Sequence, residues 1–183
     1  MSEILSRRFL ISVPQLTDPN FHRSVVFIVE HGEHGALGLV INRPSTGRLR
    51  ELLADNGVDY PGPEDFPVMI GGPVQPTQAL LLHGETDVEE DSTQVGSGLS
   101  LSGSVSVLRK VFTRTSPRAR LYFGYAGWGP GQLEAEIEAG AWIAAPVDPA
   151  LIFDAPSDEV WERALQGLGI DPAVLLAPGG SIN

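Results

Sequence analysis

Hydrophobic residues occur along this chain in short runs that predict strands more often than helices. The clearest is the continuous run Val25–Val29 inside Ser24–His31, which is typical of a strand buried on both faces. Ala36–Asn42 follows after the glycine-bounded connection Gly32–Gly35, and this spacing favours a hairpin. Five other segments have the pattern of strands: Phe9–Val13, Val68–Ile70, Ala79–His83, Ala119–Tyr125 and Ala141–Ala145.

Apolar residues at helical spacing predict four helices. The clearest covers Ser157–Gly167, with Ser157 as its cap and an apolar stripe along one face. Thr46 can cap a second helix over Gly47–Asn56. The other two are predicted over Ser104–Phe112 and Gln132–Ala139. Because helices and strands do not alternate regularly, the pattern predicts an α+β fold and not a doubly wound sheet.

The chain of 183 residues has no internal repeat, so we expect a single domain over residues 1–183. It lacks cysteine, which favours a cytosolic, reducing compartment, although secreted proteins can also lack cysteine. Arg7 and Arg8 precede an apolar run as in a secretory signal. That run, Phe9–Val13, is shorter than the roughly 7–15 apolar residues of such signals, so we interpret it as a core strand. We expect no membrane contact.

The charge is strongly negative but unevenly distributed. A formal net charge of −11 disfavours nucleic acid over most of the surface. No acidic residue lies between Asp91 and Glu134, and from Glu134 onward nine acidic residues accompany a single cation. The cations of the first stretch are Arg109, Lys110, Arg114, Arg118 and Arg120. This basic stretch is either a solvated edge that pairs with the acidic C-terminal part or a patch that binds a partner.

Known catalytic motifs do not occur in the sequence. The run Ser97–Ser106 never gives G-x-S-x-G, and Glu30–His34 does not give H-E-x-x-H, the helical zinc motif. His31 and His34 could offer a metal two imidazoles from the expected turn, but the adjacent glycines favour tight turning instead. His83 is interpreted as a strand-end residue. We therefore predict no metal site, no cofactor and no catalytic residues, and we favour a protein that is not an enzyme.

The glycine-rich segment Gly124–Gln132 is the most suggestive one for ligand binding. It follows a predicted strand and precedes a predicted helix, a context in which backbone N–H groups can hold an anion. It matches neither the Rossmann fingerprint nor the Walker loop, and Pro130 removes one N–H donor. A structural turn that lets Trp128 pack is the favoured interpretation, and phosphate or nucleotide binding is the alternative.

Several long motifs occur in a fixed order along the chain. They are FHRSVVFIVEHGEHGALGLVINRP at 21–44, GGPV at 71–74, Leu81-Leu82-His83, and GYAGWGPGQLEAEI at 124–137, followed by Trp142, Phe153-Asp154 and Trp161. Together they resemble the bacterial YqgE/AlgH family over nearly the whole chain. The resemblance implies an α+β fold with a partly closed, branched, mainly antiparallel sheet flanked by helices.

The resemblance implies less about activity. One branch of the family has a historical label as a transcriptional regulator, without a recognisable DNA-binding module, and no catalytic residues come with the resemblance. Val29 stands where some relatives have cysteine, so a thiol-based redox role cannot operate here. Pro130 replaces the small residue, usually alanine, that is expected between the two glycines.

The sequence thus favours a non-enzymatic, cytoplasmic regulatory or interaction protein with an unknown protein partner. The alternative is a domain that binds a small ligand or an anion, with or without hydrolytic activity, through Gly127–Gln132 and Glu30-His31. Specific binding of nucleic acid is not expected.

Arg43 is the first candidate for a contact residue. The triplet Asn42-Arg43-Pro44 is predicted to end a strand at the rim of the sheet, because proline cannot continue the ladder. Glu30 and His31, at the other end of the same hairpin, are the second candidates, together with Trp128. The alternative for Arg43 is an internal ion pair with one of the many acidic residues.

Overall fold

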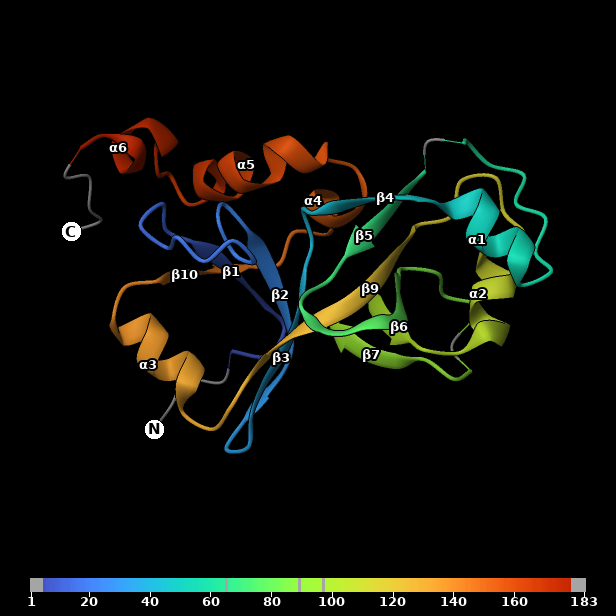
Figure 1. Cartoon of the computed structure of the whole chain (residues 1–183), viewed down its shortest axis with the longest axis horizontal. Coiled ribbons are helices and arrows are strands. Elements are labelled where there is room, and N and C mark those ends of the chain that lie inside the picture. The colour runs from blue at the N-terminus through green and yellow to red at the C-terminus, as the bar shows by residue number, and fades with distance from the viewer. Residues whose placement is uncertain (1–4, 65, 89, 97, 179–183) are drawn as a thin grey trace.

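The structure, a computed structural model, describes residues 5–64, 66–88, 90–96 and 98–178. It is built on a curled sheet in the order β10-β1-β2-β3-β9-β6-β8-β7, with β4 and β5 joined off this path (Figure 1). The strands are β1 (Arg8–Ser12), β2 (Val25–Gly32), β3 (Gly35–Val40), β4 (Pro44–Arg48), β5 (Pro67–Ile70), β6 (Val74–His83), β7 (Thr93–Gly96), β8 (Leu99–Ser102), β9 (Ala119–Trp128) and β10 (Trp142–Pro146). The helices are α1 (Leu49–Asp55), α2 (Val105–Val111), α3 (Gln132–Glu138), α4 (Pro149–Phe153), α5 (Val160–Gly167) and α6 (Pro172–Leu176), with a 3₁₀ turn at Ser157–Glu159. The predicted α+β class is confirmed.

The sheet branches at β9. Leu121–Phe123 of β9 pair in parallel with Val68–Ile70 of β5, whereas Ala126–Trp128 pair antiparallel with β3. The strand β6 lies along the opposite edge of β9. Two strands therefore occupy one edge of β9 in succession, and the sheet divides there, as the family resemblance implied.

Glycines allow the chain to cross itself closely at this branch. A Cβ on Gly71 would lie 2.3 Å from the carbonyl oxygen of Gly124, and one on Gly124 would lie 2.4 Å from that of Gly72. Gly124 also has a φ of +72°, which L side chains rarely adopt. The GGPV motif and the start of the GYAGWG motif thus meet as backbone packed on backbone.

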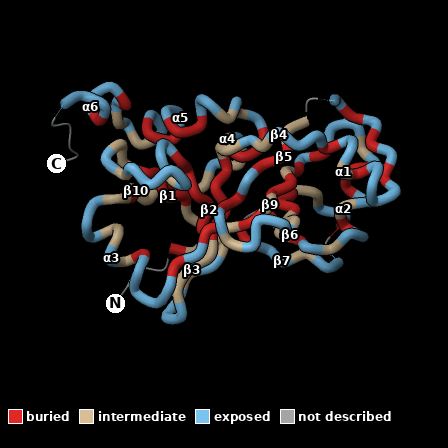
Figure 2. The backbone as a smooth tube through the Cα atoms, in the orientation of Figure 1, coloured by how far each residue is buried: buried red, intermediate tan, exposed pale blue. Residues whose placement is uncertain are grey.

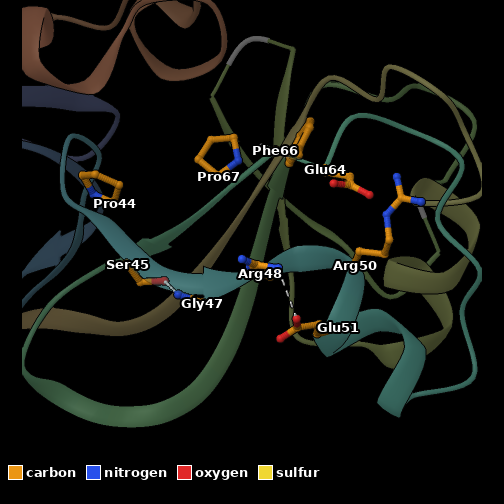
Figure 3. A pocket seen from close by; sticks show the side chains of 9 residues that line it. All are labelled: Pro44, Ser45, Gly47, Arg48, Arg50, Glu51, Glu64, Phe66 and Pro67. Carbon is orange, nitrogen blue, oxygen red and sulfur yellow. Dashed lines mark hydrogen bonds and ion pairs between the residues drawn. The ribbon is translucent and has the colours of Figure 1, made fainter.

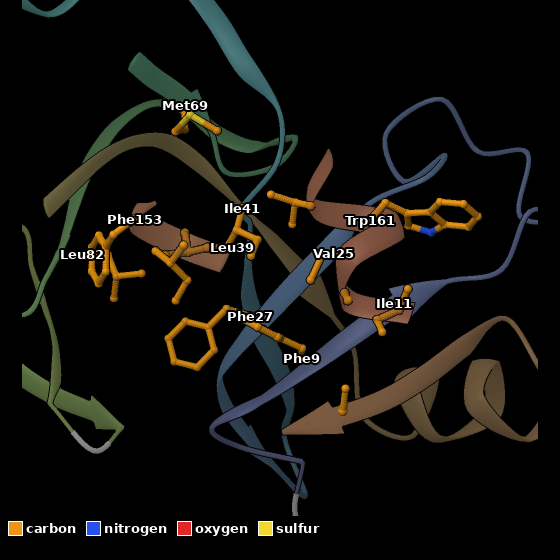
Figure 4. Packing of buried hydrophobic residues seen from close by; sticks show 14 of the residues in the cluster. Phe9, Ile11, Val25, Phe27, Leu39, Ile41, Met69, Leu82, Phe153 and Trp161 are labelled. Carbon is orange, nitrogen blue, oxygen red and sulfur yellow. The ribbon is translucent and has the colours of Figure 1, made fainter. Parts of the chain in front are cut away.

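Successive residues of β1 and β2 alternate between two buried faces. Phe9 and Phe27 lie in the main core, which α4, α5 and α6 cover and to which Trp161 belongs (Figure 4). Leu10 and Ile28 face a second core beneath α3. The continuous apolar run in β2 therefore reflects burial on both faces, as predicted.

A third core lies under α1 and α2. Leu49 and Leu53 of α1 and Val107 and Val111 of α2 pack with Leu121 of β9. Figure 2 shows buried positions along the crossing strands and exposed positions along the outer sides of the helices. The long strand β9 contributes to all three cores, so it connects the parts of the molecule.

The segment after β3 differs from its sequence-based prediction. Pro44 does not end the sheet at this point. It is the first residue of the edge strand β4, where the ladder needs no N–H donor. Thr46 is consequently a strand residue and no cap, and α1 begins only at Leu49. Ser157, the other predicted cap, begins the 3₁₀ turn, and α5 begins only at Val160, with Glu159 at its N-cap position.

Other elements were missed or shortened by the sequence pattern. The strand predicted to end at Tyr125 continues to Trp128, and the polar segment after residue 92 forms the hairpin β7–β8 against β6. The short helices α4 and α6 each begin with proline after an aspartate cap, Asp148 or Asp171. That Asp-Pro signal was readable in the sequence.

Within the described part of the chain, no helix is long and apolar enough to cross a membrane. The apolar segment that resembled a secretory signal is β1, whose residues Phe9, Leu10 and Ile11 are all buried.

Candidate functional site

Three of the four predicted contact residues line one hollow. Glu30, His31 and Trp128 meet at the end of the β2–β3 hairpin, around a cavity of about 380 Å³. Gly35 brings the hairpin against β9, since a Cβ there would lie 2.1 Å from the carbonyl oxygen of Trp128. Arg43 lies beyond the opposite end of β3, as expected. A contact role for these four residues stays a prediction.

Both ring nitrogens of His31 serve the structure. The N–H of Leu5 donates to Nδ1 at 3.0 Å, so the ring proton lies on Nε2, which faces Oε1 of Glu134 at 2.6 Å. Only 3% of the His31 side chain is exposed. A hydrogen bond to its own backbone, followed by the bond to His31, lowers the pKa of Glu134. His31 therefore has no free lone pair for a metal.

The other residues that the sequence offered as metal ligands lie at the tip of the β2–β3 hairpin. His34 and Glu33 lie 3.3 Å apart, with side chains 95% and 86% exposed. Among residues 5–64, 66–88, 90–96 and 98–178, no group of three or more histidine, cysteine or acidic side chains is close enough to hold a metal ion.

Trp128 is fixed by an acceptor that it shares with a second indole. Oε2 of Glu136 accepts from Nε1 of Trp128 at 2.9 Å and from Nε1 of Trp142 at 2.8 Å. Phe21 stacks on Trp128 and meets Trp142 edge-on, with ring centroids 6.0 and 5.6 Å apart. Gln132 donates to Oε1 of Glu136 at 3.1 Å, so both carboxylate oxygens are engaged.

The segment considered for anion binding is mostly strand. β9 includes Gly124–Trp128, which leaves only residues 129–131 as a turn before α3. The N–H of Gly129 donates to Oε1 of Gln132 at 3.0 Å, and Gly131 turns the chain with a φ of +73°. With Glu134 in the first turn of α3, the arrangement fits the structural interpretation, in which the turn lets Trp128 pack.

Asn42 and Arg43 fasten the loop that precedes β2. Asn42 accepts from the N–H of Val25 at 3.0 Å and donates to the carbonyl oxygen of Arg23 at 2.9 Å. Arg43 donates to the carbonyl oxygen of Asn20 at 2.6 Å. The internal partner found for Arg43 is thus a carbonyl group and not the carboxylate considered from the sequence.

The basic stretch pairs mainly with the acidic loop before β7. Arg114 binds both Glu85 and Asp87, and its hydrogen bond to Asp87 lowers the pKa of that carboxyl group. Arg118 reaches Asp154, with 3.4 Å between charged atoms. The expected pairing with the acidic C-terminal part therefore holds for Arg118, whereas Arg114 pairs with a loop closer in sequence.

A wider groove lies where β4 passes the segment leading into β5 (Figure 3). Its volume is about 630 Å³, within the usual range of ligand sites. The apolar part of its lining is Pro44, Phe66 and Pro67, and Ser45 and Gly47 line it along β4. Of these residues, only Pro44 was singled out from the sequence, as the predicted end of a strand.

Charged side chains stand at one end of this groove. Arg48 is 75% exposed and lies 3.7 Å from Glu51, an exposed pair worth little to stability. Arg50 donates to the carbonyl oxygen of Gly62 at 2.5 Å, and its guanidinium lies 6.0 Å from the centre of the Tyr60 ring. Arg50 is thus held in place, and Glu64 lines the same groove (Figure 3).

A protein-family model described as AlgH-like matches residues 9–173. This chain belongs to the AlgH-like family.

Relatives of the AlgH-like chain match it over almost their full lengths. A UPF0301 protein of Anaeromyxobacter dehalogenans (strain 2CP-C) is 42% identical, with 96% of this chain and 94% of that protein covered. A UPF0301 protein of Myxococcus xanthus is 40% identical, with 96% and 97% covered. The solution structure of the AlgH protein from Pseudomonas aeruginosa has a TM-score of 0.76, 38% identity and complete coverage of both chains. The resemblance noted in the sequence is confirmed.

His83 of this AlgH-like chain is a buried strand-end residue. Its Nε2 lies 2.9 Å from Oγ of Ser92, and that hydroxyl donates to the carbonyl oxygen of Val88 at 3.2 Å. The imidazole therefore donates to the serine and cannot act as its base in this arrangement. Nδ1 is buried without a hydrogen-bond partner among the described residues.

Burial makes His83 a pH-sensitive element of stability. Desolvation, only partly opposed by Glu85, lowers the pKa of His83 from its ordinary value of 6.5. The unfolded chain takes up a proton near pH 6.5 that the folded chain resists, so the free energy of unfolding should fall as the pH drops below about 6.5. The slope from this residue is at most about 1.4 kcal/mol per pH unit. The free energy of unfolding, measured with urea at several pH values between about 7.5 and 5, should depend less on pH in His83→Gln than in the wild type. His34→Gln, at an exposed position, should leave this pH dependence unchanged. Equal slopes in wild type and His83→Gln would contradict this assignment.

Proposed function

We propose that this chain is a non-enzymatic, cytoplasmic regulatory or interaction protein that binds its partner in the groove beside β4. The observation that carries the proposal is the groove itself, where an open strand, an apolar floor and exposed guanidinium groups occur together. Sites of this kind combine apolar area with a few polar groups that fix orientation.

The state of the reactive side chains supports a role without catalysis. His31 is bound at both ring nitrogens, and His83 donates to Ser92. A nucleophile needs a base within reach that can accept its proton, and this hydrogen-bond pattern offers none at Ser92. These side chains hold the N-terminal segment and the loop before β7 in place.

Regulation by protein contact suits the charge distribution better than direct DNA binding. Arg114 and Arg118 of the basic stretch bind acidic side chains of the same chain, which reduces the positive field available to phosphates. We expect the purified protein not to bind duplex DNA specifically at physiological salt, and any weak retention at low salt should disappear steeply as the salt concentration rises.

Binding of a small ligand or an anion is the alternative function, through the turn Gly127–Gln132 and the hollow lined by Glu30 and His31. Two features of the turn weigh against an anion there: the N–H of Gly129 is occupied by Gln132, and α3 is only seven residues long. The hollow is also bordered by the exposed carboxylate of Glu33, which disfavours anions.

The proposed function is tested by crosslinking inside the native bacterium. A photo-crosslinking amino acid at exposed Thr46 of β4 should give discrete protein adducts, and one at exposed Glu162 of α5 should not. Gly47→Leu should remove the adducts, because this side chain would enter the groove; its Cβ would meet only Oγ of Ser45 at 3.3 Å and a Leu52 methyl group at 3.8 Å. Gly103→Leu, where a Cβ meets nothing within 4 Å, is the matched control. Adducts that are equal at both sites, or unchanged in Gly47→Leu, would exclude this groove as the binding surface.

A further inference from the structure

We propose that Leu5 and Ser6 form a latch that is closed over His31 while its imidazole is neutral and that opens when the imidazole takes up a second proton. The latch lies at the end of the β2–β3 hairpin, outside the groove beside β4, so it adds a regulatory device to the proposed function and does not depend on it.

Three hydrogen bonds among the described residues hold the latch, each of them to His31. The N–H of Leu5 donates to Nδ1 of the ring at 3.0 Å. Oγ of Ser6 accepts from the N–H of His31 at 2.9 Å and donates to its carbonyl oxygen at 3.4 Å. The bond to Nδ1 is the one that depends on protonation, because an N–H can donate to this atom only while it keeps its lone pair.

The closed latch covers an apolar site and a strand edge. Leu5 is only 6% exposed and belongs to the same core as Trp128, Leu133 and Trp142. Strand β1 pairs with β2 only from Arg8, opposite Ile28, so it does not reach His31. There Ser6 takes the place of a strand neighbour by binding both backbone groups of His31. Opening of the latch therefore uncovers an apolar site and unpaired strand backbone together, the features by which sheet edges bind other chains.

Proton uptake by the ring favours the open latch. A proton on Nδ1 would place one N–H against the N–H of Leu5, so the closed latch would lose this hydrogen bond. The new donor would also be left without an acceptor in a buried place, since only 3% of the His31 side chain is exposed. A buried charged donor without a partner is costly, whereas in the open latch water can accept from it. The proton thus binds the open state better and shifts the population toward it.

Glu134 keeps the ring in position in both states. Its Oε1 lies 2.6 Å from Nε2 of His31, and Nε2 carries a proton in the neutral ring of the closed latch and in the charged ring. The carboxylate of Glu134 also stabilises the charged ring, as a nearby opposite charge does. The other titratable or charged residues on the elements around His31 are Glu30, Glu33 and His34 on the hairpin, Glu136 and Glu138 on α3, and Arg7 and Arg8 beside the latch. Glu136 is bound to the two indoles, and the position that differs between the two states is Nδ1.

Arg7 has the backbone of a hinge under strain. Its φ of +65° lies in the left-handed region that side chains other than glycine disfavour. Its N–H donates to the carbonyl oxygen of Ile28 at 2.7 Å, which fixes the chain to β2 just before β1 begins. Leu5 and Ser6 can therefore leave His31 while β1 stays in the sheet. Release of this strain favours opening, so the loss of one hydrogen bond is enough to move the equilibrium.

The test is amide hydrogen exchange of the full-length protein, followed by NMR between about pH 7.5 and 5. The protection factor of the Leu5 amide, which corrects for the intrinsic effect of pH, should fall about fivefold or more over this range. The amide of Leu10 in β1 is the internal reference for opening of the sheet itself, and its protection should fall less. In His31→Asn, Oδ1 stands where Nδ1 stands in histidine but takes up no proton, so Leu5 should stay protected throughout. His34→Asn, at a side chain that is 95% exposed, should behave as the wild type does.

Two further variants test the direction of the effect. His31→Lys is charged over the whole range and offers no acceptor, so Leu5 should be unprotected already at pH 7.5. Glu134→Gln can still accept from Nε2 but has no charge, so the loss of protection should move to lower pH; this variant decides the matter if His31→Lys does not fold. A Leu5 amide that is equally protected at pH 7.5 and 5 in the wild type, or unprotected at both, would overturn the latch. An equal loss of protection in His31→Asn would show that His31 is not the residue that responds to pH.

Discussion

Gly124→Ala is expected to destabilise the protein by about 3 kcal/mol or more, a large share of the roughly 5–15 kcal/mol that keeps a domain folded. The new Cβ would lie 2.4 Å from the carbonyl oxygen of Gly72 and 3.0 Å from that of Val74, both backbone atoms that cannot turn aside. Overpacking of this kind costs about 1–3 kcal/mol, and the left-handed φ adds roughly 1–2 kcal/mol. Chemical denaturation followed by circular dichroism measures the loss.

Gly127→Ala is the matched control within the same motif. The nearest atom to its Cβ would be a methyl group of Val74 at 3.6 Å, an ordinary contact, and Gly127 is exposed on β9. Alanine in a strand is favoured over glycine by about 0.5–1 kcal/mol, so this variant should be as stable as wild type or slightly more so. Equal stabilities of the two variants would refute the backbone crossing as the reason for these glycines.

Glu136→Ala should cost about 2–4 kcal/mol, because it removes the acceptor of two indole N–H groups at once. Trp128 and Trp142 would each keep a donor without a partner in a largely buried place. Glu136→Gln should cost clearly less, since its carbonyl oxygen can still accept from both rings. Glu138→Ala, at an exposed position on the same helix, should change stability by less than about 0.5 kcal/mol.

Tryptophan fluorescence provides a second measurement on Glu136→Ala. The loss of the shared acceptor should shift the emission of Trp128 and Trp142, whereas Trp161 keeps its bond to the carbonyl oxygen of Ser12 at 2.8 Å. An unchanged spectrum together with unchanged stability would show that the carboxylate is dispensable. Partner adducts at Thr46 should persist in folded Glu136→Gln, since the two tryptophans lie outside the groove.

The class of the fold and its central strands were predictable from the sequence. The apolar run of β2 and the hairpin to β3 were predictable because alternate residues of these strands enter two different cores, which leaves no polar position in Val25–Ile28. The family was recognisable from its long motifs, and the branched sheet was what that resemblance implied; the structure places two of these motifs, GGPV and GYAGWG, at a backbone crossing. The single-domain organisation over residues 1–183 stays a prediction.

The groove and the contacts of Glu30, His31 and Trp128 depend on the packing of segments that are far apart in the sequence. Local pattern placed Thr46 at a helix start, whereas pairing with β5 draws residues 44–48 into an edge strand and brings Arg50 beside Phe66 from a distant segment. Glu30, His31 and Trp128 meet because β3 pairs with β9, and no spacing in the sequence announces that pairing. The spacing of hydrophobic residues along the chain indicates which residues are buried. The partners of a polar side chain, however, depend on contacts between segments far apart in the chain.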